Sequence, residues 1–162
     1  LEALVKASNV PVIVKETGCG FAKPTLVRLN NLGISAVDVS GLGGTHWGRI
    51  EGHRAEQQSL QYQAADIFKH WGIQTSVSVR EAVNLSPSFE VWGSGGVRHG
   101  LDSAKLFALG ATTVGFAKPM LEAALASTEA VTLKMQSIEH ALKIAMFCTG
   151  SATISSLKEK IC

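Results

Sequence analysis

The feature that most constrains the fold of this sequence is an internal repeat with a spacing of about 77 residues. Apolar strand positions and glycines coincide when the first segment is laid over the second: Val14 on Val91, Gly18 on Gly95, Leu32-Gly33 on Leu109-Gly110 and Val37 on Val114. Each segment predicts a strand, a glycine-rich turn, a helix, a glycine stop and a second strand. Repeated βα units organise β/α barrels, although a doubly wound sheet has the same local pattern.

Short β-branched apolar runs predict four strands, the first of them a buried parallel strand. The expected strands cover residues 10–15, 34–40, 89–93 and 112–117, and the expected helices cover 24–31, 55–71, 75–84, 103–109, 120–126 and 131–147. Residues 45–54 are expected to form a polar loop. Thr75 is a candidate N-cap, and Asp102 is expected to open its helix. Four strands with intervening helices would make half of an eight-stranded barrel.

Composition excludes several classes of protein. The 162 residues are 46% hydrophobic and 17% charged, which indicates a packed core and not a disordered chain. A net charge of +2 gives no reason to expect a nucleic acid or a membrane surface as partner. No apolar stretch has the length of a membrane span. Three widely separated cysteines suggest no disulfide framework and favour a reducing, cytoplasmic setting. Because Leu1 is not Met and residues 1–6 look like the end of a helix, we interpret the chain as a fragment.

Two glycine-containing turns follow neighbouring strands and predict one phosphate pocket. Glycines allow the backbone to approach a bound group closely, and free N–H groups where a helix begins attract phosphate. The carboxyl ends of barrel strands share one mouth, so the two turns would face the same ligand. The predicted phosphate turns consist of Gly95, Gly96, Val97 and Arg98 in the first and Ala117 and Lys118 in the second. Val97 and Arg98 are expected to contribute mainly backbone N–H groups.

Several motifs in a fixed order resemble the type 2 isopentenyl-diphosphate isomerases, a family of flavin enzymes of isoprenoid synthesis. These are Val-Lys-Glu at 14–16, Gly-Gly-Thr-His-Trp at 43–47, Ile-Glu-Gly-His-Arg at 50–54, Ser-Gly-Gly-Val-Arg at 94–98 and Cys-Thr-Gly at 148–150. The Gly-Gly-Thr-x-Trp and Ile-Glu-x-x-Arg pair is the most specific of them. The resemblance runs from about residue 10 to residue 157.

The resemblance implies an α/β fold: the C-terminal half of an FMN-dependent (β/α)8 TIM barrel. Residues 1–162 would supply strands 5–8 of the parent protein, with C-terminal helices at about 120–160. It implies interconversion of isopentenyl diphosphate and dimethylallyl diphosphate by acid–base chemistry of reduced FMN, with NADPH as reductant, Mg²⁺ for the diphosphate, and a homo-oligomer. The family's proton-carrying glutamine and magnesium-binding glutamate lie upstream, so no catalytic residue or metal ligand is assigned within this chain.

Three further cofactor-binding residues are predicted at the ends of the first two strands. Lys15 would point into the barrel mouth, where a fixed cation beside the flavin stabilises negative charge on the reduced ring. Ser40 and Thr45 would bond the ribityl chain or the phosphate through their hydroxyl groups. His46 is within reach of substrate on this interpretation, as is His53. The Glu51 and Arg54 pair is expected to organise the loop around Trp47.

Two other functions remain open from the sequence. The chain could belong to an FMN-dependent 2-hydroxy-acid oxidase, a related class that carries a catalytic histidine after the second of these strands. Here no histidine directly follows Ser40, which argues against that chemistry. Alternatively, the chain is an inactive folded fragment, whose unpaired sheet edges would pair with another half-barrel.

Overall fold

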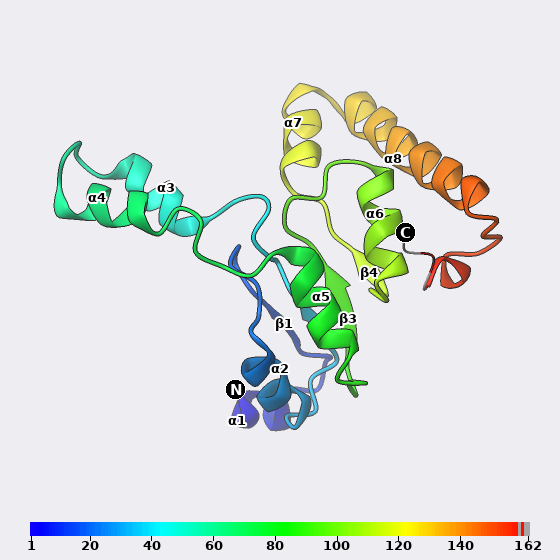
Figure 1. The fold of residues 1–162 in the computed structure, drawn as a ribbon, viewed down its shortest axis with the longest axis horizontal. Helices are drawn as coiled ribbons and strands as arrows, with labels where there is room; N and C mark the ends of the chain where they lie inside the picture. The colour runs from blue at the N-terminus through cyan, green and yellow to red at the C-terminus, as the bar shows by residue number, and fades with distance from the viewer. Residues whose placement is uncertain (159, 161–162) are drawn as a thin grey trace.

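The fold is a single parallel sheet with helices packed on it. The computed structural model describes residues 1–158 and residue 160. Within these residues four strands lie in the order β1 (Ile13–Lys15), β2 (Ala36–Asp38), β3 (Glu90–Gly93) and β4 (Thr113–Val114), and all neighbouring pairs are parallel (Figure 1). Sequential parallel strands joined through helices confirm the predicted half-barrel of βα units. Each strand is shorter than the range expected for it, although the flanking N–H groups of Ser35 and Val39 still donate to the carbonyl oxygens of Val12 and Trp92.

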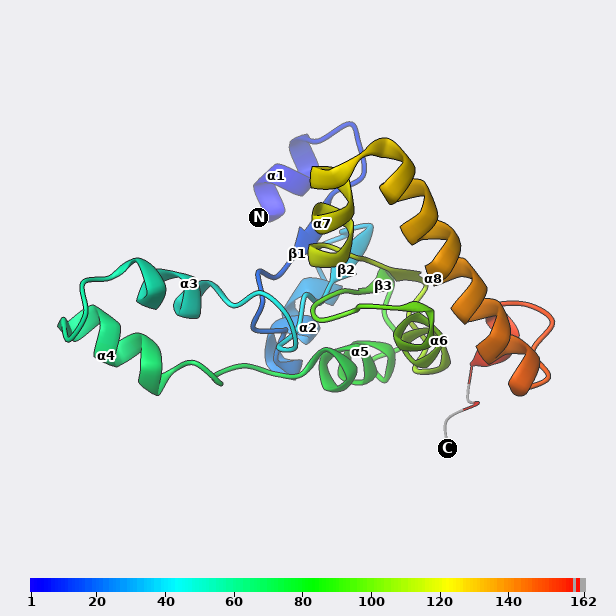
Figure 2. The same cartoon turned by 90° about the horizontal axis from the view of Figure 1, so that it is seen from above.

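The core lies between one face of the sheet and three helices. Strand register places Val14 beside Val37, Val37 beside Val91, and Gly93 beside Val114. Because side chains alternate across a strand, these positions share one face. The helices α2 (Lys23–Asn30), α5 (Thr75–Val83) and α6 (Gly100–Ala108) cover that face (Figure 2). The buried cluster comprises Leu26, Leu29, Ile34, Val37, Val39, Val79, Ala82, Phe89, Val91, Val97, Leu106 and Ala111.

The repeat found in the sequence corresponds to equivalent places in the fold. Gly18 and Gly95 both have positive φ in the turn after a strand, at 131° and 100°. Gly33 and Gly110 both have positive φ beyond a helix, at 70° and 100°. Glycine adopts this conformation without the steric cost that a Cβ imposes. The glycine spacing therefore predicted the turns correctly.

The opposite face of the sheet is partly open, although Ala36 and Asp38 of β2 are buried on it. Ile13, Lys15 and Glu90 are exposed on it, and β1 alternates between exposed and half-buried residues. The expectation of a fully buried first strand is therefore wrong. β1 is an edge strand, and in a closed barrel this face would point inward against the other strands.

Residues 45–71 differ most from expectation. The predicted polar loop at 45–54 contains the helix α3 (Trp47–Arg54), and the predicted helix at 55–71 is limited to α4 (Leu60–Ile67). The two helices pack against each other and project as an arm from the sheet (Figure 1). Large apolar side chains of this arm are exposed, with Leu60 at 85% and Trp71 at 69%. Within the described residues, no other element covers the apolar side of this arm.

Helix starts also differ from the predicted caps. α5 begins after Gln74, which makes no side-chain capping bond, so Thr75 is not the N-cap. The Thr75 hydroxyl instead donates to the carbonyl oxygens of Ser94 and Gly95, at 3.1 and 2.7 Å. α6 begins at Gly100 and is capped by His99, whose ring accepts from the Asp102 N–H. The predicted opening at Asp102 is therefore late by about one turn.

The remaining helices lie at the two ends of the chain. They are α1 (Glu2–Ala7), α7 (Lys118–Ala126), α8 (Thr128–Cys148) and the short η1 (Ser155–Leu157). α8 packs against α6 and α7, and Gly100 lies so close that an added Cβ would meet the Ile138 carbonyl oxygen. Figure 2 shows α8 running along the outside of α6. In the part of the chain that the structure describes, no helix is both long and apolar enough to cross a membrane.

Candidate cofactor site at the strand ends

The predicted residues Lys15 and Ser40 meet at the carboxyl ends of β1 and β2. Lys15 Nζ donates to Ser40 Oγ at 2.7 Å and to the Glu16 carbonyl oxygen at 3.0 Å. Parallel strands end at the same edge of a sheet, which is where α/β proteins bind their ligands. The cation therefore stands at the mouth of the half-barrel, as the sequence predicted.

Asp38, which the sequence interpretation missed, connects these residues to β3. It is the last residue of β2 and only 8% exposed. Its carboxylate accepts from Ser94 Oγ at 2.7 Å and from the Ser40 N–H at 3.2 Å. Asp38 Oδ2 lies 3.7 Å from Lys15 Nζ. The sequence feature that could have indicated Asp38 is that it is the single acidic residue in the apolar run Ala-Val-Asp-Val at 36–39.

The glycine turns after β2 and β3 pack tightly against each other. Gly95 has φ of 100°, and a Cβ there would meet the Gly41 carbonyl oxygen. A Cβ on Gly44 would lie 2.6 Å from the Gly96 nitrogen. Side chains at these positions would push the turns apart. The two turns thus form one cradle of backbone groups.

The first predicted phosphate turn presents free donors, but not all those expected. In the described part of the chain, the N–H groups of Gly96 and Val97 donate to no protein acceptor. The Arg98 N–H already donates to Asp102 Oδ2 at 3.0 Å, so the expectation that it is a free donor is wrong. The Arg98 guanidinium donates to the carbonyl oxygens of Gly43 and Gly96, at 3.3 and 3.2 Å. This side chain joins the two turns of the cradle.

The second predicted turn lies at the start of α7. Ala117 is the residue before the helix, and Lys118 is its first residue. Gly115 connects this turn to β3, because its N–H donates to the Gly93 carbonyl oxygen at 2.9 Å. Lys118 Nζ lies 3.6 Å from a Glu122 carboxylate oxygen, and its side chain is 80% exposed. The cation is therefore free to reorient toward an anion at the mouth.

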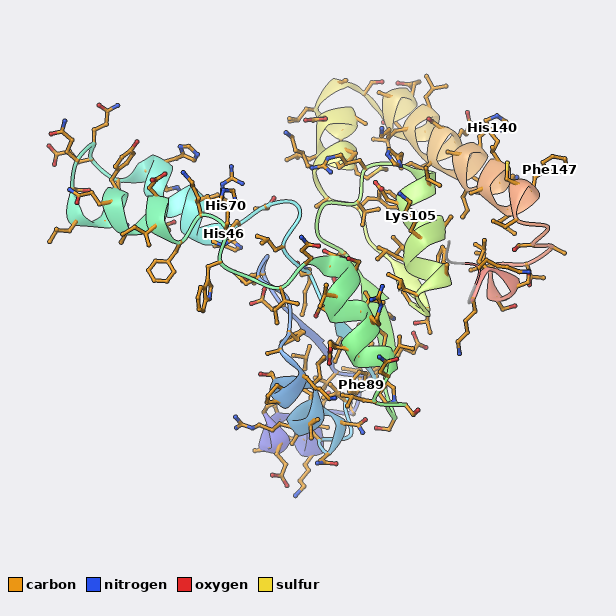
Figure 3. The ribbon with its side chains drawn as sticks, viewed as in Figure 1. His46, His70, Phe89, Lys105, His140 and Phe147 are labelled. Atoms are coloured by element: carbon orange, nitrogen blue, oxygen red, sulfur yellow. The ribbon has the colours of Figure 1, made fainter. Side chains whose placement is uncertain are left out.

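The loop after β2 contains two of the predicted residues, Thr45 and His46, and the structure places them differently. Thr45 is exposed, and its carbonyl lies against Gly18 in the turn after β1. His46 is buried, and its Nδ1 accepts from the Arg49 N–H at 3.2 Å. Its Nε2 lies 2.9 Å from the Trp71 carbonyl oxygen. Figure 3 shows His46 at the base of the arm, where its ring caps α3. A contact from His46 to substrate stays a prediction.

Other side chains of the arm are exposed. Trp47 begins α3, and Arg54 pairs with Glu51 at 3.0 Å, as expected. His53 is also exposed on α3, and no contact joins it to the strand ends within the described residues. His70 in the turn after α4 and His140 on α8 are both exposed.

Comparison with known proteins identifies the family. The model of a family described as FMN-dependent dehydrogenase matches residues 1–162. The chain belongs to the FMN-dependent dehydrogenase family. It is 68% identical over 162 residues to an isopentenyl-diphosphate delta-isomerase of Legionella pneumophila, covering all of this chain and 47% of that protein. An isopentenyl-diphosphate delta-isomerase of Bdellovibrio bacteriovorus is 52% identical over 160 residues, which is 99% of this chain and 46% of that protein. The chain thus spans about half the length of these relatives.

Solved structures with the same fold include a mandelate oxidase and a flavocytochrome b2. A mandelate oxidase superposes with a TM-score of 0.72 at 22% identity, over 98% of this chain and 43% of that chain. A flavocytochrome b2 superposes with a TM-score of 0.70 at 22% identity, over 98% of this chain and 36% of that chain. At this identity the likeness concerns the fold alone. It agrees with the half-barrel described above.

The strand-end residues of this FMN-dependent dehydrogenase family member fit a flavin phosphate. The cradle is lined by glycines whose Cβ atoms would clash, and it presents the free N–H groups of Gly96 and Val97. Backbone donors of this kind bind phosphate. The Lys15 ammonium lies near the Asp38 carboxylate, which accepts from Ser94 directly before the cradle. A positive charge therefore stands close to the cradle. In the part of the chain that the structure describes, no group of three or more His, Cys, Asp or Glu side chains is placed to hold a metal ion.

A hollow of about 410 Å³ lies behind the cradle, between α5 and α6. Its lining includes Gln74, Ser76, Val97, Lys105 and Leu109. Of these residues, Lys105 lies on α6 (Figure 3). The hollow is on the helical side of the sheet, whereas Lys15 and Asp38 are on the open side. The hollow nevertheless adjoins the cradle, because Gly43, Gly95 and Gly96 also line it.

The turn after β1 is held by a carboxylate. Glu16 Oε2 accepts from the N–H groups of Gly18, Cys19 and Gly20, at 2.8, 2.6 and 3.1 Å. Burial raises the pKa of the Cys19 thiol, and the negative charge of Glu16 raises it further. Cys19 Sγ lies 3.5 Å from His46 Nε2. The thiol is therefore kept neutral, which suits a packing role and not a nucleophilic one.

Proposed function

We propose that the protein carrying this chain interconverts isopentenyl diphosphate and dimethylallyl diphosphate, with FMN bound at the strand ends. The observation that carries the proposal is the 68% identity to the Legionella isomerase over every residue of the chain. The cradle of Gly95 and Gly96 supports it, because it offers backbone donors beside a fixed cation. Proteins that share a fold can differ in activity. The 68% identity to the isomerase is therefore stronger evidence for function than the likeness in fold to a mandelate oxidase at 22% identity.

Several of the predicted residues have roles that follow from their positions. The Gly96 and Val97 N–H groups, with the Lys118 ammonium, would hold the phosphate of FMN. The exposed hydroxyl of Thr45 would bond the ribityl chain. Ser40 contributes mainly by accepting from Lys15. When bound and reduced, FMN supplies acid–base chemistry that adds a proton to one carbon of the allylic system and removes one from another.

Lys15 would set the charge next to the flavin. Its ammonium is held at 2.7 Å from Ser40 Oγ, at the mouth and on the open face of the sheet. A preorganised cation stabilises negative charge that develops nearby, and it does so without reorganisation during the reaction. Replacing Lys15 with Met would keep the stem and remove this charge.

The finer parts of the proposal concern the whole protein. We propose NADPH as the reductant of FMN and Mg²⁺ as the counter-ion of the substrate diphosphate. We also propose that residues 1–162 supply strands 5–8 of the barrel, and that the protein is a cytoplasmic homo-oligomer without a nucleic acid or membrane partner. The open sheet edges at β1 and β4 support pairing with the remaining strands.

The decisive experiment measures isomerisation of ¹³C-labelled isopentenyl diphosphate by NMR. It uses the full-length protein that carries this chain, with FMN, NADPH and Mg²⁺. A second sample is the Legionella isomerase in which this chain replaces the matching 162 residues. Formation of dimethylallyl diphosphate by both, and much less with Lys15→Met, is the expected result.

Two outcomes would contradict the proposal. Hydrogen peroxide formation from a 2-hydroxy acid, without isomerisation, would indicate the oxidase alternative. An inactive graft that still retains FMN after desalting would show that the fold binds the cofactor without supporting isomerisation. This chain alone is the third sample, and its inactivity is expected because it spans about half of the relatives.

A further inference from the structure

We propose that Asp38 is a positioning residue that fixes both the Lys15 ammonium and the cofactor cradle. The proposal rests on the function proposed above and adds a residue to its site. Asp38 lies on the open face of the sheet between the two features that it would connect. It has polar contacts to residues of three successive strand ends: Lys15, Ser40 and Ser94.

On one side, Asp38 and Ser40 together hold Lys15. An ammonium group has three donors, and Lys15 uses two of them on Ser40 Oγ and the Glu16 carbonyl oxygen. The Asp38 carboxylate at 3.7 Å is too far for a short hydrogen bond but close enough for charge attraction. Asp38 also accepts from the Ser40 N–H, so it orders the residue that accepts from Lys15. Among the described residues the third ammonium donor has no acceptor, which leaves it for a ligand.

Ser40 has a strained backbone that needs such an anchor. Its φ is 35°, in the left-handed region that residues other than glycine rarely adopt. Strain of this kind persists where neighbouring contacts hold it, and it is common at functional sites. The hydrogen bond from the Ser40 N–H to Asp38 is one such contact, at 3.2 Å.

On the other side, Asp38 holds the residue that precedes the cradle. Ser94 Oγ donates to Asp38 Oδ1 at 2.7 Å, and Gly95 and Gly96 follow directly. One carboxylate therefore sets the distance between the cation and the phosphate turn. A flavin that spans both would bind best when that distance is fixed in advance.

The negative charge of Asp38 is unexpected for a residue with only a fold role. Burying a carboxylate costs free energy unless it is paired, and a neutral amide would accept the same two hydrogen bonds. In the part of the chain that the structure describes, Lys15 is the cation within 4.0 Å of this carboxylate. The negative charge of Asp38 is therefore explained by the nearby Lys15 ammonium, because Ser94 and Ser40 would donate equally well to a neutral amide.

The test measures FMN affinity and isomerase kinetics of Asp38→Asn in the full-length protein. Asn keeps an acceptor for Ser94 and Ser40 but removes the attraction to Lys15. We expect the Kd of FMN to rise about tenfold, as for loss of one charged interaction, and kcat to fall. The KM for isopentenyl diphosphate should stay within twofold. The matched control is Asp66→Asn, an exposed carboxylate paired with Lys69 at 2.9 Å, with no expected change.

A double-mutant cycle separates positioning from general destabilisation. In the Lys15→Met background, Asp38→Asn should change the FMN Kd by less than twofold, because the partner is already gone. A full tenfold loss in that background would overturn the proposal, as would an unchanged Kd in the Asp38→Asn single variant. Where Asp38→Asn yields no folded protein, Asp38→Glu decides, because it keeps the charge and displaces it. Weaker FMN binding then supports the proposal, and wild-type affinity contradicts it.

The proposed function and this inference fail in different ways. If the wild-type protein neither retains FMN nor isomerises the substrate, the proposed function is wrong. If the wild-type protein does both and Asp38→Asn matches it, only the positioning role is wrong.

Discussion

Ser78 and Phe21 exchange two hydrogen bonds between α5 and the loop that follows β1. The Ser78 hydroxyl donates to the Phe21 carbonyl oxygen at 3.0 Å and accepts from the Phe21 N–H at 2.9 Å. Ser78 is fully buried. One hydroxyl thus satisfies both backbone groups of a residue distant in sequence, and it fixes the loop that begins at Glu16, directly after Lys15.

We expect Ser78→Ala to destabilise the protein by about 2 kcal/mol. The substitution leaves the Phe21 N–H and carbonyl without their partner, and buried unsatisfied groups cost about 1–3 kcal/mol. Urea unfolding followed by circular dichroism measures the change. Ser76→Ala is the matched control, because Ser76 lies on the same helix and makes no hydrogen bond through its hydroxyl among the described residues. Equal unfolding midpoints for the two variants would contradict the prediction.

We expect Gly95→Ala to weaken FMN binding by more than tenfold and to lower stability. Two effects combine here: a positive φ of 100° and a Cβ that would meet the Gly41 carbonyl oxygen. The cradle must open to admit the methyl group, which displaces the Gly96 and Val97 donors. FMN titration and urea unfolding report the two losses separately.

The control for Gly95→Ala isolates backbone strain. Gly150 also has positive φ, at 64°, but no atom lies within 4 Å of the position of its added Cβ. Gly150→Ala should therefore cost about 1 kcal/mol of stability and leave FMN affinity unchanged. Similar losses for both variants would mean that close packing of the two turns is unimportant.

Local sequence patterns were sufficient for the sheet and for most of the helices. Valines at 14, 37, 91 and 114 indicate the buried face because strand side chains alternate, and the structure places all four toward the helices. The turn glycines were equally informative, since positive φ is required at Gly18 and Gly95. These features depend on the chain within a few residues of each position.

The features that the sequence did not predict depend on contacts between distant residues. α3 contains two glycines and has low helical propensity, but His46 caps it and Gly52 packs on Ala65 of α4. α4 exposes the apolar side chains of Leu60 and Ile67, and a local pattern does not say what would cover them. Asp38 was missed because its partners come from neighbouring strands, and only the register brings Lys15 beside it.

Glu16→Gln is expected to make the Cys19 thiol more reactive at lower pH. The Glu16 charge contributes to the raised pKa of this thiol, after burial, so its removal should lower that pKa. Gln keeps an acceptor for the turn N–H groups. The measurement is the pH dependence of Cys19 alkylation by iodoacetamide, followed by peptide mass spectrometry. Glu139→Gln on α8 is the control, and a profile unchanged by Glu16→Gln would contradict the prediction.

The same raised pKa predicts how stability changes at alkaline pH. The thiol of the unfolded chain loses its proton at lower pH than the folded one, so the folded state binds more protons in that range. Stability then falls as pH rises through the interval between the two pKa values, and it is unaffected below it. Cys19→Ser should remove this part of the decline. Urea unfolding across an alkaline pH series measures it, and equal slopes for both proteins would argue against it.

Lys118→Met is expected to weaken FMN binding about threefold, and less at high salt. The ammonium is exposed and has only a long contact to Glu122, so its attraction to a phosphate is partly screened. Lys118→Arg should keep or improve the affinity, because a guanidinium can bond two phosphate oxygens. Lys143→Met is the matched control, since Lys143 pairs with Glu139 across the same four-residue spacing. Fluorescence titration of FMN at two salt concentrations measures all three variants. If Lys118→Met and Lys143→Met bind FMN alike, the turn at Ala117 and Lys118 is not part of the phosphate site.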